Sequence, residues 1–165
     1  MILTNLGVQL IITGESQKMF DLSGQKFLSS VEGIRYTAYK DSGGVWTIGR
    51  GITYYEDGTK VKPGDKISVE REQKLFMNTL KYYVETVQKF VKKNLTQNQF
   101  NALVSFCYNV GSPQFKGSTL LKKVNSNPND PEIKNQFMRW VYDDGKIVQG
   151  LINRRTKEAE LYFSK

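Results

Sequence analysis

The chain has 165 residues, of which 39% are hydrophobic, so its length fits one domain with a substantial core. It contains no histidine and one cysteine, which excludes Ser-His-Asp and Cys-His nucleophiles, His-ligated or Cys-rich zinc sites and an intramolecular disulfide. Acid–base chemistry must therefore use carboxylates, Lys, Tyr or Cys. The net charge of +8 favours an anionic partner, but it does not choose between nucleic acid, a membrane surface and a cell wall.

The first 20 residues are mildly apolar and are interrupted by small or polar residues, namely Thr4, Asn5, Gly7 and Gln9. They lack a basic leading segment and a long apolar stretch, so we expect neither a cleavable signal peptide nor a membrane span. We interpret residues 1–22 as an N-terminal extension that packs on the body as a short helix or strand, in preference to a membrane anchor. Residues 23–165 are expected to form the folded domain.

The first part of that domain predicts a helix followed by a small antiparallel sheet. Ser23 is suited to cap the helix and Gly33 to end it, and the apolar positions between them are Phe27, Leu28 and Val31. From residue 34 to 66, short β-leaning runs at 36–39, 45–48 and 52–55 alternate with turn sequences. We expect these residues to form a sheet lobe.

The rest of the chain predicts helices. Apolar residues at intervals of three and four mark a helix over residues 68–93, about 35–40 Å long and able to join two lobes. Thr96 and Gln99 form a capping box before a helix that ends at Gly111. Further helices are expected at 118–124 and 151–163. Between them, another helix is expected to begin at Pro131, with Asp130 as its cap. The predicted fold is α+β, with a helical lobe at about 68–165; Cys107 lies in an apolar stripe and is expected to be buried.

Two carboxylates and a hydroxyl are predicted to meet where the first helix joins the sheet. Glu32 lies in the last helical turn, facing the negative end of the helix dipole, a position that suits a general acid. Arg35 and Arg154 oppose this effect, so its net sign is open. Asp41 before Ser-Gly-Gly is an ordinary turn residue, but an ionised carboxylate there can activate a water. With Thr47 to orient that water, such a pair of carboxylates is typical of glycoside hydrolysis.

This pattern of Glu32, eight residues, Asp41, five residues and Thr47 resembles the signature of the phage-type lysozymes, the endolysins of glycoside hydrolase family 24. Residues 102–111 are similar to the family's helix that lines the sugar cleft, and residues 150–155 resemble its closing Gly-Leu-x-x-Arg-Arg element. The resemblance covers about residues 23–163 and implies a lysozyme-like fold. One departure is Arg50-Gly51-Ile52-Thr53, where the family often has Tyr-Gly-His-Thr, and its effect on local hydrogen bonding is open.

The resemblance implies hydrolysis of the β-1,4 bond between N-acetylmuramic acid and N-acetylglucosamine. Glu32 would protonate the leaving oxygen, Asp41 would assist water from the opposite face and Thr47 would help to place that water. Tyr108 and Asn109 match positions that contact sugar. The resemblance also implies that Arg154 is the arginine that holds the catalytic glutamate.

We expect no cofactor and no metal ion, and the resemblance implies that the partner is bacterial peptidoglycan. We expect a monomer without nucleic-acid binding or stable membrane insertion. Secreted signal-anchor relatives begin with a long apolar stretch, and this chain does not. We therefore expect synthesis in the host cytoplasm and action on the cell wall after a separate holin-type partner permeabilises the membrane.

Two alternatives remain open from the sequence. A peptidoglycan lytic transglycosylase would act on the same substrate, with the muramic acid closing its own ring; the presence of Asp41 and Thr47 favours hydrolysis instead. A non-enzymatic basic module could bind nucleic acid, but no zinc-finger spacing, helix-turn-helix signal or RNA-binding aromatic motif accompanies the lysines.

Overall fold

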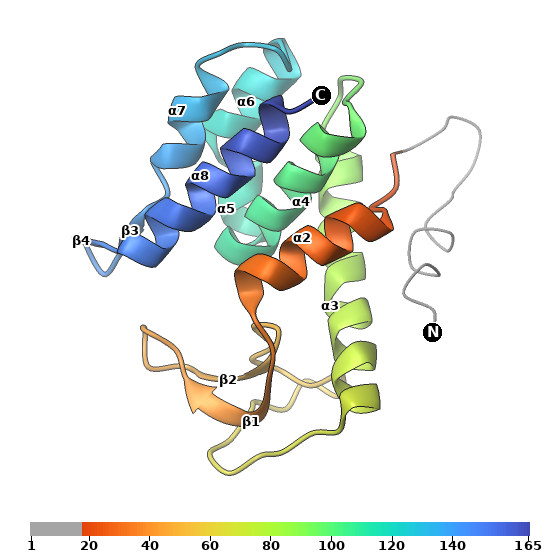
Figure 1. Ribbon diagram of the computed structural model, residues 1–165, viewed down its shortest axis with the longest axis vertical. Helices are drawn as coiled ribbons and strands as arrows, with labels where there is room; N and C mark the ends of the chain where they lie inside the picture. Colours follow the sequence, from red (N-terminus) through yellow and green to blue (C-terminus); the bar gives the residue numbers. More distant parts are fainter. Residues whose placement is uncertain (1–17) are drawn as a thin grey trace.

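A computed structural model of the chain describes residues 18–165. It has the predicted α+β architecture: a small sheet lobe, a long helix and a helical lobe. In Figure 1 the long helix α3 (Val69–Phe90) runs beside the sheet and continues upward along the helical lobe. Residues 1–17 of the predicted extension lie outside the described residues, and so does their predicted packing, whereas Phe20 is fully buried in the helical core. No helix within residues 18–165 combines the length and apolar character needed to cross a membrane.

The first described helix, α2 (Leu22–Glu32), has Asp21 as its N-terminal cap and Gly33 as its C-terminal cap. The carboxylate of Asp21 accepts a hydrogen bond from the backbone N–H of Gly24 at 2.9 Å and another from Asn101 at 2.9 Å. The prediction that Ser23 caps this helix is therefore wrong. Asp21 takes that place because the same carboxylate both caps α2 and ties it to a neighbouring helix. Gly33 has φ +69°, as its predicted role as a helix stop requires.

The sheet consists of β1 (Arg35–Lys40) and β2 (Trp46–Gly49), which pair antiparallel. The third predicted run, 52–55, forms only isolated bridges: Ile48 and Ile52 exchange backbone hydrogen bonds at 2.8 and 2.9 Å, and Tyr54 pairs with Lys60. The chain turns back too sharply for a third full strand, because Gly49 and Gly51 both adopt positive φ.

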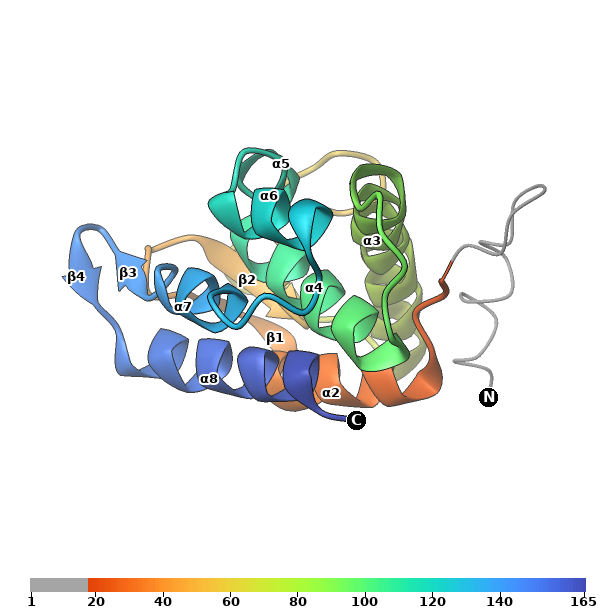
Figure 2. The same cartoon turned by 90° about the horizontal axis from the view of Figure 1, so that it is seen from above.

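Helix α3 begins within one residue of the predicted start, with Ser68 as its cap, and ends at Phe90, three residues before the expected end. The next helix, α4 (Gln97–Val110), has both halves of the capping box between Thr96 and Gln99 and stops at Gly111. Figure 2 shows α4 at the centre of the helical lobe, and it packs against α2, α3 and α8. Cys107 on this helix is fully buried, as expected.

The remaining elements are short except for the last helix. They are α5 (Ser112–Lys116), α6 (Thr119–Ser126), α7 (Ile133–Met138), β3 (Tyr142–Asp143), β4 (Lys146–Ile147) and α8 (Gln149–Phe163). The sequence did not predict α5. The prediction that Asp130 caps α7 with Pro131 as first residue is wrong, because the side chain of Asp130 accepts a bond from the Glu132 backbone within a turn that precedes the helix.

Candidate active site

The sheet register brings the predicted aspartate and threonine to one turn. Tyr39 pairs with Thr47 across β1 and β2, and Asp41 follows β1 directly. The Asp41 carboxylate accepts from the Val45 backbone N–H at 2.8 Å, and the Thr47 hydroxyl donates to the Val45 carbonyl at 3.0 Å. Asp41 is exposed whereas Thr47 is buried. The two predicted residues are therefore oriented through the same neighbour.

Glu32 lies at the end of α2, in a much less solvated place than Asp41. Its side chain is 11% exposed, and its Oε1 accepts a hydrogen bond from Nη1 of Arg154, which is 7% exposed. Its Oε2 lies under Gly51, where an added Cβ would come within 2.7 Å of that oxygen. Gly51 also has φ +76°, so both its conformation and its distance from Glu32 require glycine.

Arg154 is held by several groups besides Glu32. It donates to the Glu158 carboxylate at 3.2 Å and to the Ser105 carbonyl at 3.1 Å, and the Ser105 hydroxyl donates to Glu158 at 2.6 Å. Burial by itself would lower the pKa of Arg154, but the carboxylates of Glu32 and Glu158 outweigh it and raise that pKa. The guanidinium therefore stays charged beside Glu32.

Asn109 connects to the same network at the surface. Its Oδ1 accepts a hydrogen bond from Arg155, which also donates to the Glu158 carboxylate and to the Trp140 carbonyl. Sequence reasoning missed Glu158, which is fully buried. Its spacing three and four residues after the two arginines was the available signal, because such residues share one face of a helix.

Tyr108 connects the helical lobe to the sheet lobe. Its hydroxyl donates to the backbone carbonyl of Arg50, and its ring lies 5.1 Å from the ring of Tyr83 and 6.1 Å from that of Phe76, measured between centroids. Burial is the main reason that its pKa lies well above 10.0. Its predicted contact with sugar stays a prediction; its contact with Arg50 orients the chain next to Glu32.

A pocket of about 540 Å³ lies between the two lobes. The β1–β2 turn with Asp41 forms one side of it, and the other side carries Asn109, Trp140 and Arg155. The hydroxyl of Ser42 donates to Asp143 at 2.8 Å and joins the two sides. The pocket therefore brings together Asp41 and Asn109, two of the predicted site residues, while Glu32 and Thr47 lie outside its lining.

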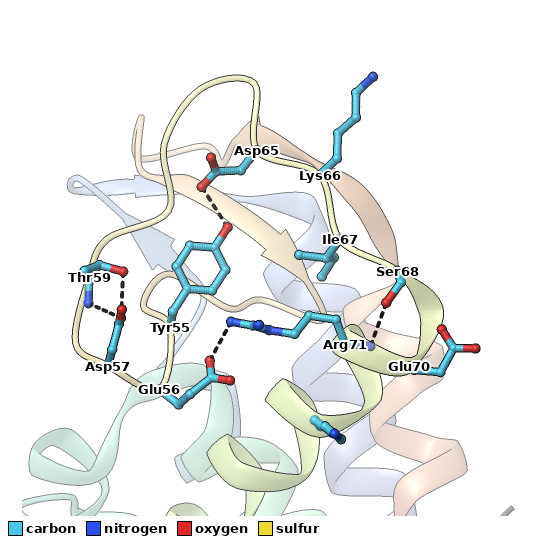
Figure 3. A pocket seen from close by; sticks show the side chains of 11 residues that line it. Tyr55, Glu56, Asp57, Thr59, Asp65, Lys66, Ile67, Ser68, Glu70 and Arg71 are labelled. Carbon is cyan, nitrogen blue, oxygen red and sulfur yellow. Dashed lines mark hydrogen bonds and ion pairs between the residues drawn. The ribbon is translucent and has the colours of Figure 1, made fainter.

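A second hollow, of about 720 Å³, lies between the loop 55–67 and the start of α3 (Figure 3). Its side chains pair with one another: Tyr55 donates to Asp65 at 2.7 Å and Arg71 to Glu56 at 3.1 Å. Burial and the bond to Asp65 raise the pKa of Tyr55 to about 12. None of the predicted site residues lines this hollow. Within residues 18–165, no group of three or more acidic, Cys or His side chains is arranged to hold a metal ion.

Comparisons with known proteins agree on one family. The family model described as phage lysozyme matches residues 29–158. The endolysin of Bacillus phage B103 is 39% identical over 144 residues, 86% of this chain and 53% of that protein. The endolysin of Salmonella phage P22 is 36% identical over 137 residues, 83% of this chain and 92% of that protein. The chain spans about half the length of the Bacillus phage endolysins that it matches.

A solved structure has the same fold. The endolysin from Escherichia coli O157:H7 phage FAHEc1 superposes with a TM-score of 0.79 at 34% identity, covering 93% of this chain and 97% of that one. This likeness confirms the predicted lysozyme-like fold. Because the family model also matches most of the sequence, the chain belongs to the phage lysozyme family.

Proposed function

We propose that the protein is an endolysin with muramidase activity, which hydrolyses the β-1,4 bond between N-acetylmuramic acid and N-acetylglucosamine in peptidoglycan. One observation carries the proposal: Glu32 is mostly buried between Arg154 and Gly51, whereas Asp41 is exposed on a hydrogen-bonded turn. Two carboxylates in such different surroundings can divide the acid and base roles of glycoside hydrolysis.

In the proposed mechanism Glu32 donates its proton to the glycosidic oxygen as the bond to the sugar carbon breaks. Arg154 then stabilises the carboxylate that Glu32 becomes, because its charged Nη1 faces that oxygen. Asp41 accepts a proton from water as the water attacks the sugar carbon, and it stabilises the positive charge that develops there. The Thr47 hydroxyl donates to Val45, which leaves its oxygen able to accept from that water.

The remaining residues have supporting roles in this proposal. Asn109 lies on the wall of the pocket opposite Asp41 and is proposed to contact sugar. Tyr108 is proposed to do so only after its bond to Arg50 is exchanged. The +8 charge would attract the enzyme to an anionic envelope. A monomeric state, synthesis in the host cytoplasm and a separate membrane-permeabilising partner remain predictions.

The test is loss of turbidity of bacteria stripped of their outer membrane, measured with wild type beside Glu32→Gln. The wild type should clear the suspension and Glu32→Gln should not, because the amide cannot donate the proton. Glu56→Gln, at an exposed glutamate of the sheet lobe, is the matched control and should remain active. Lysis by Glu32→Gln at the wild-type rate would refute the catalytic assignment.

The transglycosylase alternative is separated by its products. Mass spectrometry of digested peptidoglycan should show reducing muramic acid ends, since water completes the reaction; 1,6-anhydro ends would establish the alternative. The nucleic-acid alternative would be favoured by tight DNA binding at physiological salt without clearing of cell walls.

A further inference from the structure

The buried pair of Arg50 and Glu72 does not line the pocket, yet Arg50 contacts α2, the helix that ends at Glu32. Arg50 donates to both carboxylate oxygens of Glu72, each at 2.7 Å. The two side chains are 6% and 1% exposed. The third guanidinium nitrogen donates to the Ser29 hydroxyl at 2.9 Å, and the guanidinium lies 3.6 Å from the centre of the Phe76 ring.

The side chain of Arg50 joins two helices, and its backbone carbonyl contacts a third. Ser29 lies on α2 one turn before Glu32, and Glu72 and Phe76 lie on α3. The backbone carbonyl of Arg50 accepts from Tyr108 on α4. Arg50 itself directly follows β2, the strand that carries Thr47. One residue therefore links that strand to the helix that ends at the proposed acid.

The glycines on either side of Arg50 show how closely this segment fits. A Cβ at Gly49 would lie 3.1 Å from the Glu72 side chain, and a Cβ at Gly51 would lie 2.7 Å from Oε2 of Glu32. Segment 49–51 is thus packed between two carboxylates, one belonging to the ion pair and the other to the proposed acid. A shift of Arg50 would displace Gly51 from Glu32.

We infer that Arg50 and Glu72 form a positioning pair for the proposed hydrolysis, which keeps segment 49–51 against Glu32 and so sets where Thr47 lies relative to that acid. The inference rests on the proposed function. Stability alone does not account for the pair, since well-packed apolar replacements of a buried ion pair are often neutral or stabilising. Catalysis is more demanding, because a misplacement of about 1 Å can cost roughly a hundredfold in rate.

The experiment compares wild type with Arg50→Met/Glu72→Met, which replaces both charges by apolar side chains of similar length. Rates are measured from new reducing ends on soluble strands of alternating N-acetylglucosamine and N-acetylmuramic acid, at concentrations that separate kcat from KM. Thermal unfolding followed by circular dichroism shows whether each variant is folded at the assay temperature, and rates are compared only between folded proteins.

The double variant should stay folded with KM unchanged and kcat lower, on the order of tenfold to a hundredfold. Arg50→Lys should lie between it and wild type, because a lysine keeps the charge but cannot bind both Glu72 oxygens and Ser29 together. The matched control is Arg71→Met/Glu56→Gln, which removes an exposed ion pair of the same lobe and should leave kcat unchanged.

A folded double variant with wild-type kcat would overturn the inference while leaving the proposed function intact. If wild type released no reducing ends, the proposed function would fail instead. If the double variant does not fold, kcat and KM of Ser29→Ala test the inference instead, because this change removes the hydrogen bond that links Arg50 to α2. A reduced kcat with unchanged KM in that variant supports the pair, and an unchanged kcat overturns it.

Discussion

Arg154 donates a hydrogen bond to Glu32 across 122 positions of sequence. The arginine belongs to α8 and the glutamate to α2, so the bond ties the last helix of the chain to the helix that precedes the sheet. The proposed acid is therefore oriented by the helical lobe, while Gly51 of the sheet lobe covers its other oxygen.

Removal of Arg154 should destabilise the fold as well as the site. Arg154→Met leaves the carboxylates of Glu32 and Glu158 without this partner in a buried place, a loss of about 3–5 kcal/mol when a buried pair is broken. Urea unfolding measures the change in the free energy of unfolding. Lys157→Met is the control, because Lys157 is an exposed cation on the same helix and its loss should change stability by less than about 0.5 kcal/mol. Equal changes in the free energy of unfolding would show that the bonds of Arg154 to Glu32 and Glu158 do not stabilise the fold.

Glu158 should matter for stability although it does not touch the pocket. Glu158→Gln weakens the bonds to Arg154 and Arg155 together and should lower the melting temperature by about 6–15 °C, as expected when a buried pair is broken in a domain of this size. Glu160→Gln, an exposed change on the same helix, should alter the melting temperature little. A calorimetric scan compares them, and matching melting temperatures would argue against a structural role for Glu158.

Gly51→Ala separates backbone strain from interference with Glu32. Gly51 and Gly58 have positive φ of 76° and 83°, so alanine at either position should cost about 1–2 kcal/mol. An alanine Cβ at Gly51 meets Glu32, whereas none of the surrounding atoms lies within 4 Å of a Cβ at Gly58. We expect kcat to fall, on the order of tenfold or more, in Gly51→Ala alone. Initial rates on soluble glycan strands measure kcat for both variants. Equal kcat values would show that a Cβ next to Glu32 does not disturb the proposed acid.

Cys107 should be unreactive in the native protein. Burial raises the pKa of its thiol from 9.0 to about 12, so the reactive thiolate is scarce at pH 8. Ellman's reagent should therefore modify the native protein slowly and the urea-unfolded protein quickly. Rapid native modification at pH 8 would contradict the burial of this residue.

The same thiol makes stability depend on pH at the alkaline end. The unfolded thiol loses its proton above about pH 9 while the folded one keeps it, so the free energy of unfolding falls as pH rises from about 9 toward 12. Cys107→Ala removes this contribution and should flatten the decline. Unfolding curves of both proteins at pH 8 and pH 10.5 give the loss of unfolding free energy between the two pH values. An equal loss in wild type and Cys107→Ala would show that other groups cause the decline.

Local sequence patterns were sufficient for most helices. The Thr96–Gln99 capping box and Gly111 lie where predicted because capping depends on neighbours within one turn. Asp21 was missed as a cap because its carboxylate also binds Asn101, 80 positions away. The third strand was overpredicted because the turn at Gly49 and Gly51 is adapted to Glu72 and Glu32, contacts that no local pattern contains.

The sequence by itself determined the α+β class, the family resemblance and the spacing of Glu32, Asp41 and Thr47, because these depend on residue type and on short-range periodicity. Only the tertiary structure decided what surrounds each of them. It placed Glu32 between Arg154 and Gly51, joined Arg154 and Arg155 through Glu158, and buried the Arg50–Glu72 pair beside the sheet. The physical reason is that burial and charge pairing arise when distant segments pack together, and the sequence pattern along one segment does not contain that information.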